Sequence, residues 1–235
     1  MPLISAHRGG CGVEGLGAAE RYRRAIALGV DYVEFDVRRS LDGVMVVSHD
    51  PRTVSGRAIG EFEYGALTEE LGAEAITLEE LLDIVAGRTG LHLDLKETGF
   101  EAEVVETALR RSSIDRLVIT GDDAVVGRTK ELFPMVRAGL SLGEDLEDAS
   151  PWVKARTRLS ELFPRGRLEG CHADFVAVHH QLAELNVLRF CEREGMPAWV
   201  WTVDEEQEIA RFLADKRVAT LITDRPDIAL RLRSG

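Results

Sequence analysis

Residues 32–37 read Tyr-Val-Glu-Phe-Asp-Val, and this stretch decides the fold. Side chains alternate between the two faces of a β-strand, so Tyr32, Glu34 and Asp36 point one way and the valines and the phenylalanine point the other. The apolar face suits helices packed against a sheet. The carboxylate face needs a cation, because buried acids are costly unless a positive charge pairs with them. The stretch therefore predicts a strand with helices on one side and a polar site on the other.

Outward from this strand, apolar runs alternate with helix-period segments along the whole chain. A helix ended by Gly29 precedes the strand, and a short second strand follows the Asp42-Gly43 turn. Thr77 and Glu80 predict a capping box at the start of a helix. Strands are predicted at 3–6, 32–37, 44–47, 91–95, 117–120, 135–138, 175–178, 198–202 and 219–222. Helices are predicted at 18–28, 78–85, 101–111, 124–132, 182–194, 205–215 and 228–233, with a weaker one at 148–163.

This alternation, counted as one strand for each βα unit, gives eight units. Repeated βα units form a parallel sheet covered by helices, and eight of them in 235 residues fit a closed (β/α)8 barrel, the α/β fold known as the TIM barrel. No linker rich in Pro, Gly or Ser divides the chain, so we expect residues 1–235 to form a single domain. The least distinct stretch is 139–170, where strand and helix patterns overlap.

The composition limits the kinds of partner. A formal net charge of −12 disfavours nucleic-acid binding and stable membrane association. No apolar run reaches the roughly 18 residues that a membrane span needs, and the N-terminus lacks a signal-peptide pattern, so we expect a cytoplasmic protein. Three cysteines, Cys11, Cys171 and Cys191, share no CxxC spacing, which indicates neither a disulfide framework nor a zinc site. The oligomeric state stays open.

The reactive side chains of such a barrel come from the carboxyl ends of its strands and the loops after them. The first strand runs into His7-Arg8-Gly9-Gly10, and the short strand 44–47 runs into Ser48-His49-Asp50. Histidine titrates near neutral pH, so His7 and His49 are candidates for the base and the acid of a catalysed reaction. His179 and His180 also follow a strand, and we interpret them as loop residues.

Further candidates come from residues 91–96, which read Leu-His-Leu-Asp-Leu-Lys. Strict alternation puts His92, Asp94 and Lys96 on one face of this strand. His92 lies one layer deeper than the other two, so we interpret it as a packed residue. Trp201, at the tip of the strand 198–202, is a candidate wall for the alcohol portion of a substrate.

The three inward carboxylates, Glu34, Asp36 and Asp94, are candidate ligands for one divalent cation. Carboxylate oxygens suit a hard ion such as Mg²⁺ or Ca²⁺. Three carboxylates and a dication sum to −1, and Arg8 with Lys96 brings the cluster to +1. The sequence thus predicts a cationic site within an acidic protein, suited to a phosphodiester anion.

Taken together, these motifs resemble the glycerophosphodiester phosphodiesterase family. The matching segments are His7-Arg8-Gly9, 34–50, 77–80, 91–96, 199–203 and 222–227, in the family's order and over nearly the whole chain. The resemblance implies a barrel fold and a phosphoric diester hydrolase. Its reaction would be the hydrolysis of glycerophosphodiesters, small-molecule substrates, to glycerol 3-phosphate and an alcohol with a divalent cation.

The resemblance also implies roles for individual residues. By match of position, His7 and His49 take the acid/base places and Glu34 and Asp36 take two metal-ligand places. Arg8 and Lys96 take phosphate-contacting places.

Two positions depart from the family pattern. Asp94 stands where the family usually carries Glu, and its side chain reaches one methylene less far. Gly15-Leu16-Gly17-Ala18 stands where the family carries Pro-Glu-Asn-Thr, in a loop that normally shapes the mouth of the site. We therefore expect a more open mouth and weak discrimination among head groups.

Two other functions fit these residues. A phospholipase D-like phosphodiesterase or lyase acting on phospholipids would fit Asp94, since related barrel phospholipases use Asp there. A non-catalytic barrel that binds a phosphorylated ligand would fit the altered loop. The lack of a signal-peptide pattern, the odd number of cysteines and the absence of an evident apolar membrane-docking loop count against the phospholipase D-like enzyme. Both histidines and all three acids are present, which counts against the non-catalytic barrel. The sequence does not identify the alcohol that is released or the metal used in the cell. It also does not decide whether the nucleophile is water or the glycerol 2-hydroxyl.

Overall fold

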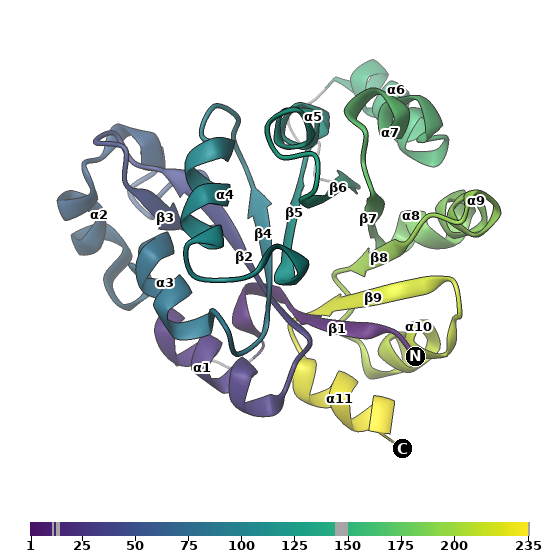
Figure 1. Cartoon of the computed structure of the whole chain (residues 1–235), viewed down its shortest axis with the longest axis horizontal. Helices are drawn as coiled ribbons and strands as arrows, with labels where there is room; N and C mark the ends of the chain where they lie inside the picture. The colour runs from purple at the N-terminus through teal and green to yellow at the C-terminus, as the bar shows by residue number, and fades with distance from the viewer. Residues whose placement is uncertain (11, 13–14, 144–149, 235) are drawn as a thin grey trace.

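The computed structural model describes residues 1–10, 12, 15–143 and 150–234, in which strands and helices alternate (Figure 1). The strands are β1 Leu3–Ala6, β2 Tyr32–Arg39, β3 Met45–Val47, β4 Gly90–Leu95, β5 Leu117–Gly121, β6 Arg137–Leu142, β7 Phe175–His179, β8 Ala198–Trp201 and β9 Val218–Thr223. The helices are α1 Ala18–Leu28, α2 Tyr64–Leu71, α3 Leu78–Val85, α4 Glu101–Leu109, α5 Asp123–Leu132, α6 Pro151–Leu162, α7 Arg165–Cys171, α8 His180–Leu182, α9 Leu188–Glu194, α10 Glu206–Ala214 and α11 Pro226–Ser234.

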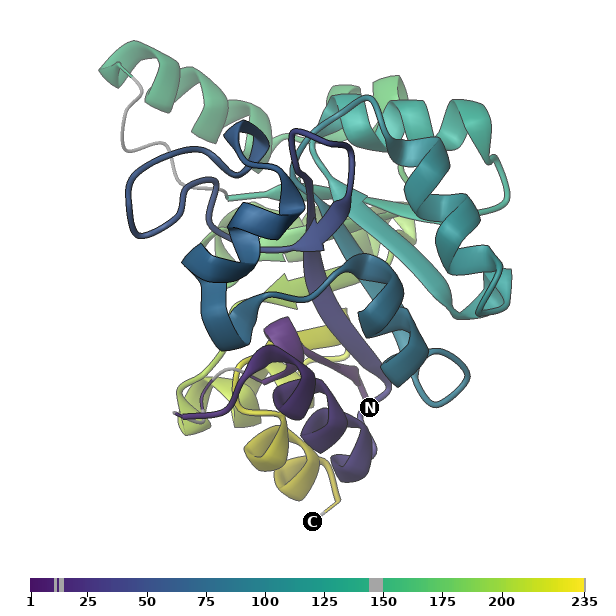
Figure 2. The ribbon, with the colours of Figure 1, turned by 90° about the vertical axis from the view of Figure 1, so that its left-hand side faces the viewer.

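Eight of the described strands close into a parallel barrel. The pairing runs from β1 through β2, β4, β5, β6, β7, β8 and β9 back to β1, and β3 adds an antiparallel strand to the end of β2. Helices surround the barrel, and both chain termini lie at the end opposite the strand tips (Figures 1 and 2). The predicted (β/α)8 barrel is confirmed.

The core has two layers, one on each side of the barrel wall. The outward side chains of the strands pack against the helices, and Val33, Phe35 and Val37 belong to this layer. A smaller cluster, Tyr32, Val118, Phe175, Ala177, Trp199 and Ile222, fills the barrel interior. Gly139 makes room for it, since a Cβ there would lie 2.2 Å from the Phe175 ring. The alternation read from residues 32–37 therefore holds in three dimensions.

Several boundaries follow directly from local sequence chemistry. Helix α1 has the predicted bounds and ends at Gly29, whose φ of +80° is readily adopted only without a side chain. Helix α3 begins with the predicted capping box, in which Thr77 and Glu80 satisfy each other's backbone N–H groups.

Other boundaries differ from the prediction. Strand β6 begins at Arg137 rather than 135, because the chain first turns after α5 and leaves Met135 81% exposed. The predicted helix 182–194 is split into α8 and α9 by a π-helical turn, Ala183–Val187. Helices α2 and α7 were not predicted. The predicted helix 148–163 appears as α6, capped by the Ser150 side chain, and its first two predicted residues lie outside the described residues.

Two further features bear on the sequence expectations. In the described ranges, no helix is both long and apolar enough to cross a membrane. Cys171 and Cys191 are buried free thiols, and Cys11 lies outside the described residues.

Candidate active site

A cavity of about 810 Å³ opens at the carboxyl ends of the barrel strands. All eight candidate side chains from the sequence line it: His7, Arg8, Glu34, Asp36, His49, Asp94, Lys96 and Trp201. The structure thus brings together residues that are almost 200 positions apart in the chain. Position at a strand end was sufficient to find them.

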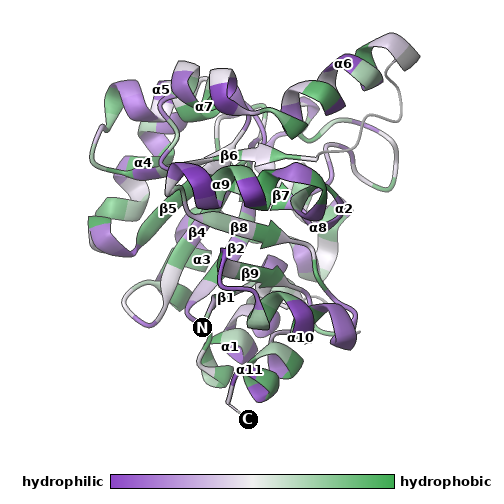
Figure 3. Ribbon diagram, turned by 90° about the vertical axis from the view of Figure 1, so that its right-hand side faces the viewer, coloured by the Kyte–Doolittle hydropathy of each residue, from purple (hydrophilic) through white to green (hydrophobic). Residues whose placement is uncertain are grey.

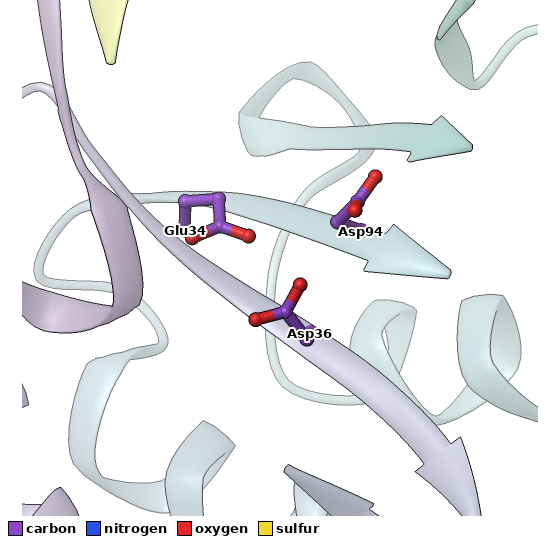
Figure 4. Close-up of side chains that lie close together, drawn as sticks. All are labelled: Glu34, Asp36 and Asp94. Carbon is purple, nitrogen blue, oxygen red and sulfur yellow. The ribbon is translucent and has the colours of Figure 1, made fainter. Parts of the chain in front are cut away.

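The three carboxylates converge at the floor of this cavity (Figure 4). One oxygen from each of Glu34, Asp36 and Asp94 lies within 4.8 Å of the others. Strand register explains the convergence, because β2 and β4 run in parallel with Asp36 directly beside Asp94. All three are buried, at 3%, 2% and 8% exposure. Burial, reinforced by the charge of Asp36, raises the pKa of Glu34 to about 8. Ionising all three carboxylates together therefore requires a cation close to them.

Lys96 provides part of that positive charge. Its Nζ lies 3.0 Å from Asp36 Oδ1 and also contacts Asp94 Oδ2. Burial opposes the ammonium, but the two carboxylates outweigh it and raise the pKa of Lys96. Burial likewise acts to raise the pKa of Asp94, and Lys96 reverses this and lowers it. Thr120 Oγ1 donates to Asp94 Oδ1 at 2.6 Å, so both oxygens of Asp94 are held.

The donor set fits a divalent cation. Glu34, Asp36 and Asp94 offer hard oxygen ligands from two adjacent rigid strands, the type of site that Mg²⁺ and Ca²⁺ prefer. With all three carboxylates ionised, as a bound cation would favour, the cluster that includes Arg8 and Lys96 has three negative and two positive charges. One dication would change this net charge of −1 to +1.

Arg8 enters the site through a strained turn. Its φ is +49°, a conformation that non-glycine residues rarely adopt. Its backbone N–H donates to Glu34 Oε2 at 2.8 Å, and its Nε lies 3.5 Å from Asp36 Oδ2. The buried Nε has no hydrogen-bond partner among the described residues. An unsatisfied guanidinium N–H in a cavity suits an anionic ligand.

His7 is oriented by an acid that the sequence analysis did not single out. His7 Nδ1 and Asp224 Oδ1 are 2.7 Å apart, and the Asp224 backbone N–H donates to Asp204 Oδ1 at 2.8 Å. His7 Nε2 lies 4.0 Å from Glu34 Oε2, on the side of the carboxylates. Asp224 therefore sets the ring so that Nε2 faces the carboxylates.

The buried side chain of Arg38 holds the backbone of His49 in place. Arg38 donates two hydrogen bonds to the His49 carbonyl, at 3.1 and 2.8 Å, and pairs with Glu97 at 2.8 Å. The His49 ring bonds Asp50 through Nδ1 at 2.8 Å. Burial lowers the pKa of His49, so the ring is neutral at pH 7. Arg38 was missed, although it continues the inward parity of residues 32, 34 and 36.

The opposite wall of the cavity is built from β6 to β9. Trp201 lines it, and its buried Nε1 has no hydrogen-bond partner among the described residues. His179 contacts the Trp201 ring edge-on, with centroids 5.2 Å apart. His179, interpreted as a loop residue, instead ends β7 and lines the cavity, while His180 bonds the Thr202 carbonyl. The period-two pattern of β7 could have placed His179 there, beside Phe175 and Ala177.

His92 lies deeper, as interpreted from the sequence. It is 2% exposed and bonds Ser5 Oγ at 3.2 Å and Thr120 Oγ1 at 3.0 Å. Burial lowers its pKa to about 4. Through Thr120, His92 supports Asp94.

The residues at the place of the altered loop lie away from the cavity. Gly15, Leu16, Gly17 and Ala18 are not among its lining residues. Gly17 instead packs closely against Ala73, and the Leu16 carbonyl accepts from Arg21 at 3.0 Å. In the described part of this loop, nothing therefore shapes the mouth of the site.

Comparison with known proteins agrees with this geometry. A sequence model of the Glycerophosphoryl diester phosphodiesterase family matches residues 14–126, which include Glu34, Asp36, His49, Asp94 and Lys96. A glycerophosphodiester phosphodiesterase of Caldanaerobacter subterraneus is 25% identical over 251 residues, which cover 98% of this chain and 97% of that protein.

Solved structures show the same fold. A phosphodiesterase of Oleispira antarctica, in complex with the product sn-glycerol-3-phosphate, superposes with a TM-score of 0.79 at 20% identity, covering 100% of this chain and 98% of the other. A glycerophosphodiester phosphodiesterase of Thermotoga maritima gives a TM-score of 0.73 at 23% identity, with coverage of 100% and 99%.

Proposed function

We propose that this chain, which belongs to the glycerophosphoryl diester phosphodiesterase family, hydrolyses glycerophosphodiesters to glycerol 3-phosphate and an alcohol. One observation carries the proposal. Three buried carboxylates converge within 4.8 Å beside two histidines and two cationic side chains, in the cavity at the strand ends. The product in the Oleispira antarctica complex is the glycerol phosphate expected here.

Glu34, Asp36 and Asp94 are the residues that would hold the divalent cation, which we take to be Mg²⁺ or Ca²⁺. When bound, such an ion polarises a phosphoryl oxygen and neutralises charge that develops on it. Arg8 and Lys96 then bind the non-bridging oxygens of the phosphodiester. The unsatisfied Nε of Arg8 supports this role.

The two histidines move protons. His49 is neutral at pH 7 because burial lowers its pKa, so it can accept the proton of the nucleophile. His7, fixed by Asp224 with Nε2 toward the site, then donates a proton to the leaving alkoxide. Displacement at phosphorus needs the attacking and leaving oxygens roughly opposed, which two histidines from separate loops can serve.

Release of glycerol 3-phosphate from glycerophosphocholine, glycerophosphoethanolamine and glycerophosphoglycerol tests the proposal. We expect release from all three, loss after exhaustive chelation, and recovery with Mg²⁺ or Ca²⁺. Phosphocholine as the product would mean that the wrong ester bond is cleaved. Binding of these compounds without turnover would indicate a non-catalytic barrel. The cytoplasmic location and the single-domain organisation stay predictions from the sequence.

A further inference from the structure

Helix α6 turns its apolar side toward solvent. Trp152, Leu159 and Phe163 are 78%, 60% and 66% exposed. Trp152 and Leu159 are seven residues apart and so lie on one face of α6, and Phe163 follows the helix directly at its C-cap. Val153 beside them is 46% exposed. The opposite side carries Glu161, which is 3% exposed and accepts from the Gly143 backbone N–H at 2.9 Å. The usual amphipathic arrangement is therefore inverted.

This helix borders the mouth of the active-site cavity. Arg158, on the inner side of α6, lines the cavity and donates to Glu161 at 2.7 Å. Figure 3 shows α6 projecting beyond the other helices at the end of the barrel toward which β7, β8 and β9 point. The outward apolar face, defined as Trp152, Val153, Leu159 and Phe163, thus lies next to the route by which substrate enters.

The size of the outward apolar face limits what can cover it. From the area that such side chains expose, the face presents on the order of 500 Å², which is at the upper end for one patch on a monomer. A stable dimer buries roughly 800 Å² on each partner. The face is therefore too small to hold a second copy alone, while patches of this size on a monomer are often functional.

Its chemistry suits a phospholipid–water interface. Tryptophan and phenylalanine favour the boundary between head groups and acyl chains. Arg156, exposed on the same face between Trp152 and Leu159, would meet the phosphates that every phospholipid carries. Residues 150–168 contain five basic residues and one acidic residue, but four acids occur at 144–149. The charges balance locally, so the apolar side chains would supply most of the attraction.

We infer that the outward apolar face of α6 docks on a phospholipid–water interface. From there, phosphodiesters that carry an acyl chain reach the neighbouring cavity. The second part rests on the proposed function, while the docking does not. The sequence expectation of no stable membrane association used the charge of the whole chain, which does not register a local apolar face.

The test uses the full chain and a triple variant, Trp152→Ser/Leu159→Ser/Phe163→Ser. The matched control is Leu132→Ser/Met135→Ser, two exposed apolar residues before β6, at the opposite end of the barrel. Co-sedimentation with zwitterionic phosphatidylcholine vesicles should show binding of the wild type and the control. The triple variant should bind at least about tenfold less, and 0.5 M NaCl should change wild-type binding less than twofold.

Catalysis is measured on two substrates. The triple variant should hydrolyse vesicle-embedded lysophosphatidylcholine at least about tenfold more slowly, yet soluble glycerophosphocholine at the wild-type rate, which also shows that it folds. Vesicle binding by the triple variant equal to wild type, or none by wild type, would overturn the docking. The docking would also be overturned if sedimentation velocity showed a dimer for the wild type and a monomer for the triple variant. Inactivity of the wild type on glycerophosphocholine would contradict the proposed function without affecting the vesicle result.

Discussion

The two walls of the active-site cavity are built by the same alternation but carry opposite chemistry. The wall from β1, β2 and β4 presents Glu34, Asp36, Asp94 and Lys96, all buried or nearly so. The strands β6 to β9 of the other wall present Ser141, Ala177, His179, Trp201 and Ile222, none of them a carboxylate or an ammonium. The charge of Arg158, which α6 adds to this side, is paired with Glu161. We therefore propose that the charged wall binds and cleaves the phosphodiester, and that the strands of the neutral wall shape what is attached to it.

The difference follows from the cost of buried charge. A carboxylate at the strand end must have a cation within a few ångströms, so the charged residues gather on strands that are direct neighbours. The neutral wall has no such requirement and packs by ring contact instead, as His179 does on Trp201. We therefore assign reaction chemistry to the first wall and head-group selectivity to the second.

The largest effect is expected from the carboxylates. Glu34→Gln and Asp36→Asn each remove a ligand and a charge, so we expect kcat to fall at least about 10⁴-fold, together with metal affinity measured by isothermal titration calorimetry. Asp94→Glu restores the residue usual in the family and should keep activity within about tenfold. Glu103→Gln, half-exposed on α4, is the matched control and should behave as wild type. Full activity of Glu34→Gln would show that the carboxylates of this wall are not needed for the reaction.

The histidines come next. His7→Ala and His49→Ala should each lower kcat about 10²–10⁴-fold, because each removes one proton transfer. The double variant should be far less than multiplicatively worse, since the two residues act as a unit. Metal affinity and thermal stability should stay unchanged. A single variant that kept more than about a tenth of kcat, where chemistry limits the rate, would lose its assigned role.

The pH profile separates the two histidines. His49 acts as a base only when neutral, and burial lowers its pKa below the ordinary 6.5. The acid limb of kcat/KM should therefore lie below pH 6.5, with a tenfold loss for each further pH unit. It should disappear in His49→Ala. An acid limb above pH 6.5 would contradict the assignment.

Stability must be followed in the same pH range. The pKa of buried His92 is about 4 when folded and near 6.5 when unfolded, so the unfolded state binds more protons between these values. Its contribution to stability is complete above pH 6.5 and falls by about 3 kcal/mol as the pH drops to 4. Circular dichroism at each pH distinguishes this loss from the catalytic limb.

The charged wall was the part of the site that the sequence could predict. Alternation along residues 32–37 and 91–96 fixes which side chains point inward, whatever the rest of the fold does. The same alternation also predicts that Arg38 and His179 point inward, because each lies two residues beyond an inward-pointing residue of its strand.

The supporting residues could not be predicted in this way. Asp224 meets His7 across 217 positions, and Thr120 meets Asp94 through the pairing of their strands, so neither contact leaves a local pattern. The outward face of α6 is a different case. Its spacing reveals an amphipathic helix, but only the packing of Glu161 against Gly143 decides which side faces the barrel.

The smallest effect is expected from variants of the neutral wall. It tests whether reaction chemistry and head-group selectivity belong to separate walls. Trp201→Ala removes a ring that lines the cavity and a free indole N–H, and we expect KM for glycerophosphocholine to rise about tenfold with kcat within twofold. His179→Ala, its edge-on neighbour, should act in the same direction by less. Because the wall is neutral and roomy, wild-type kcat/KM for the choline, ethanolamine and glycerol head groups should differ by less than about a hundredfold, or roughly 2.7 kcal/mol. If Trp201→Ala instead lowered kcat as strongly as His7→Ala, the two walls would share the chemistry, and the contrast between them would lose its functional meaning.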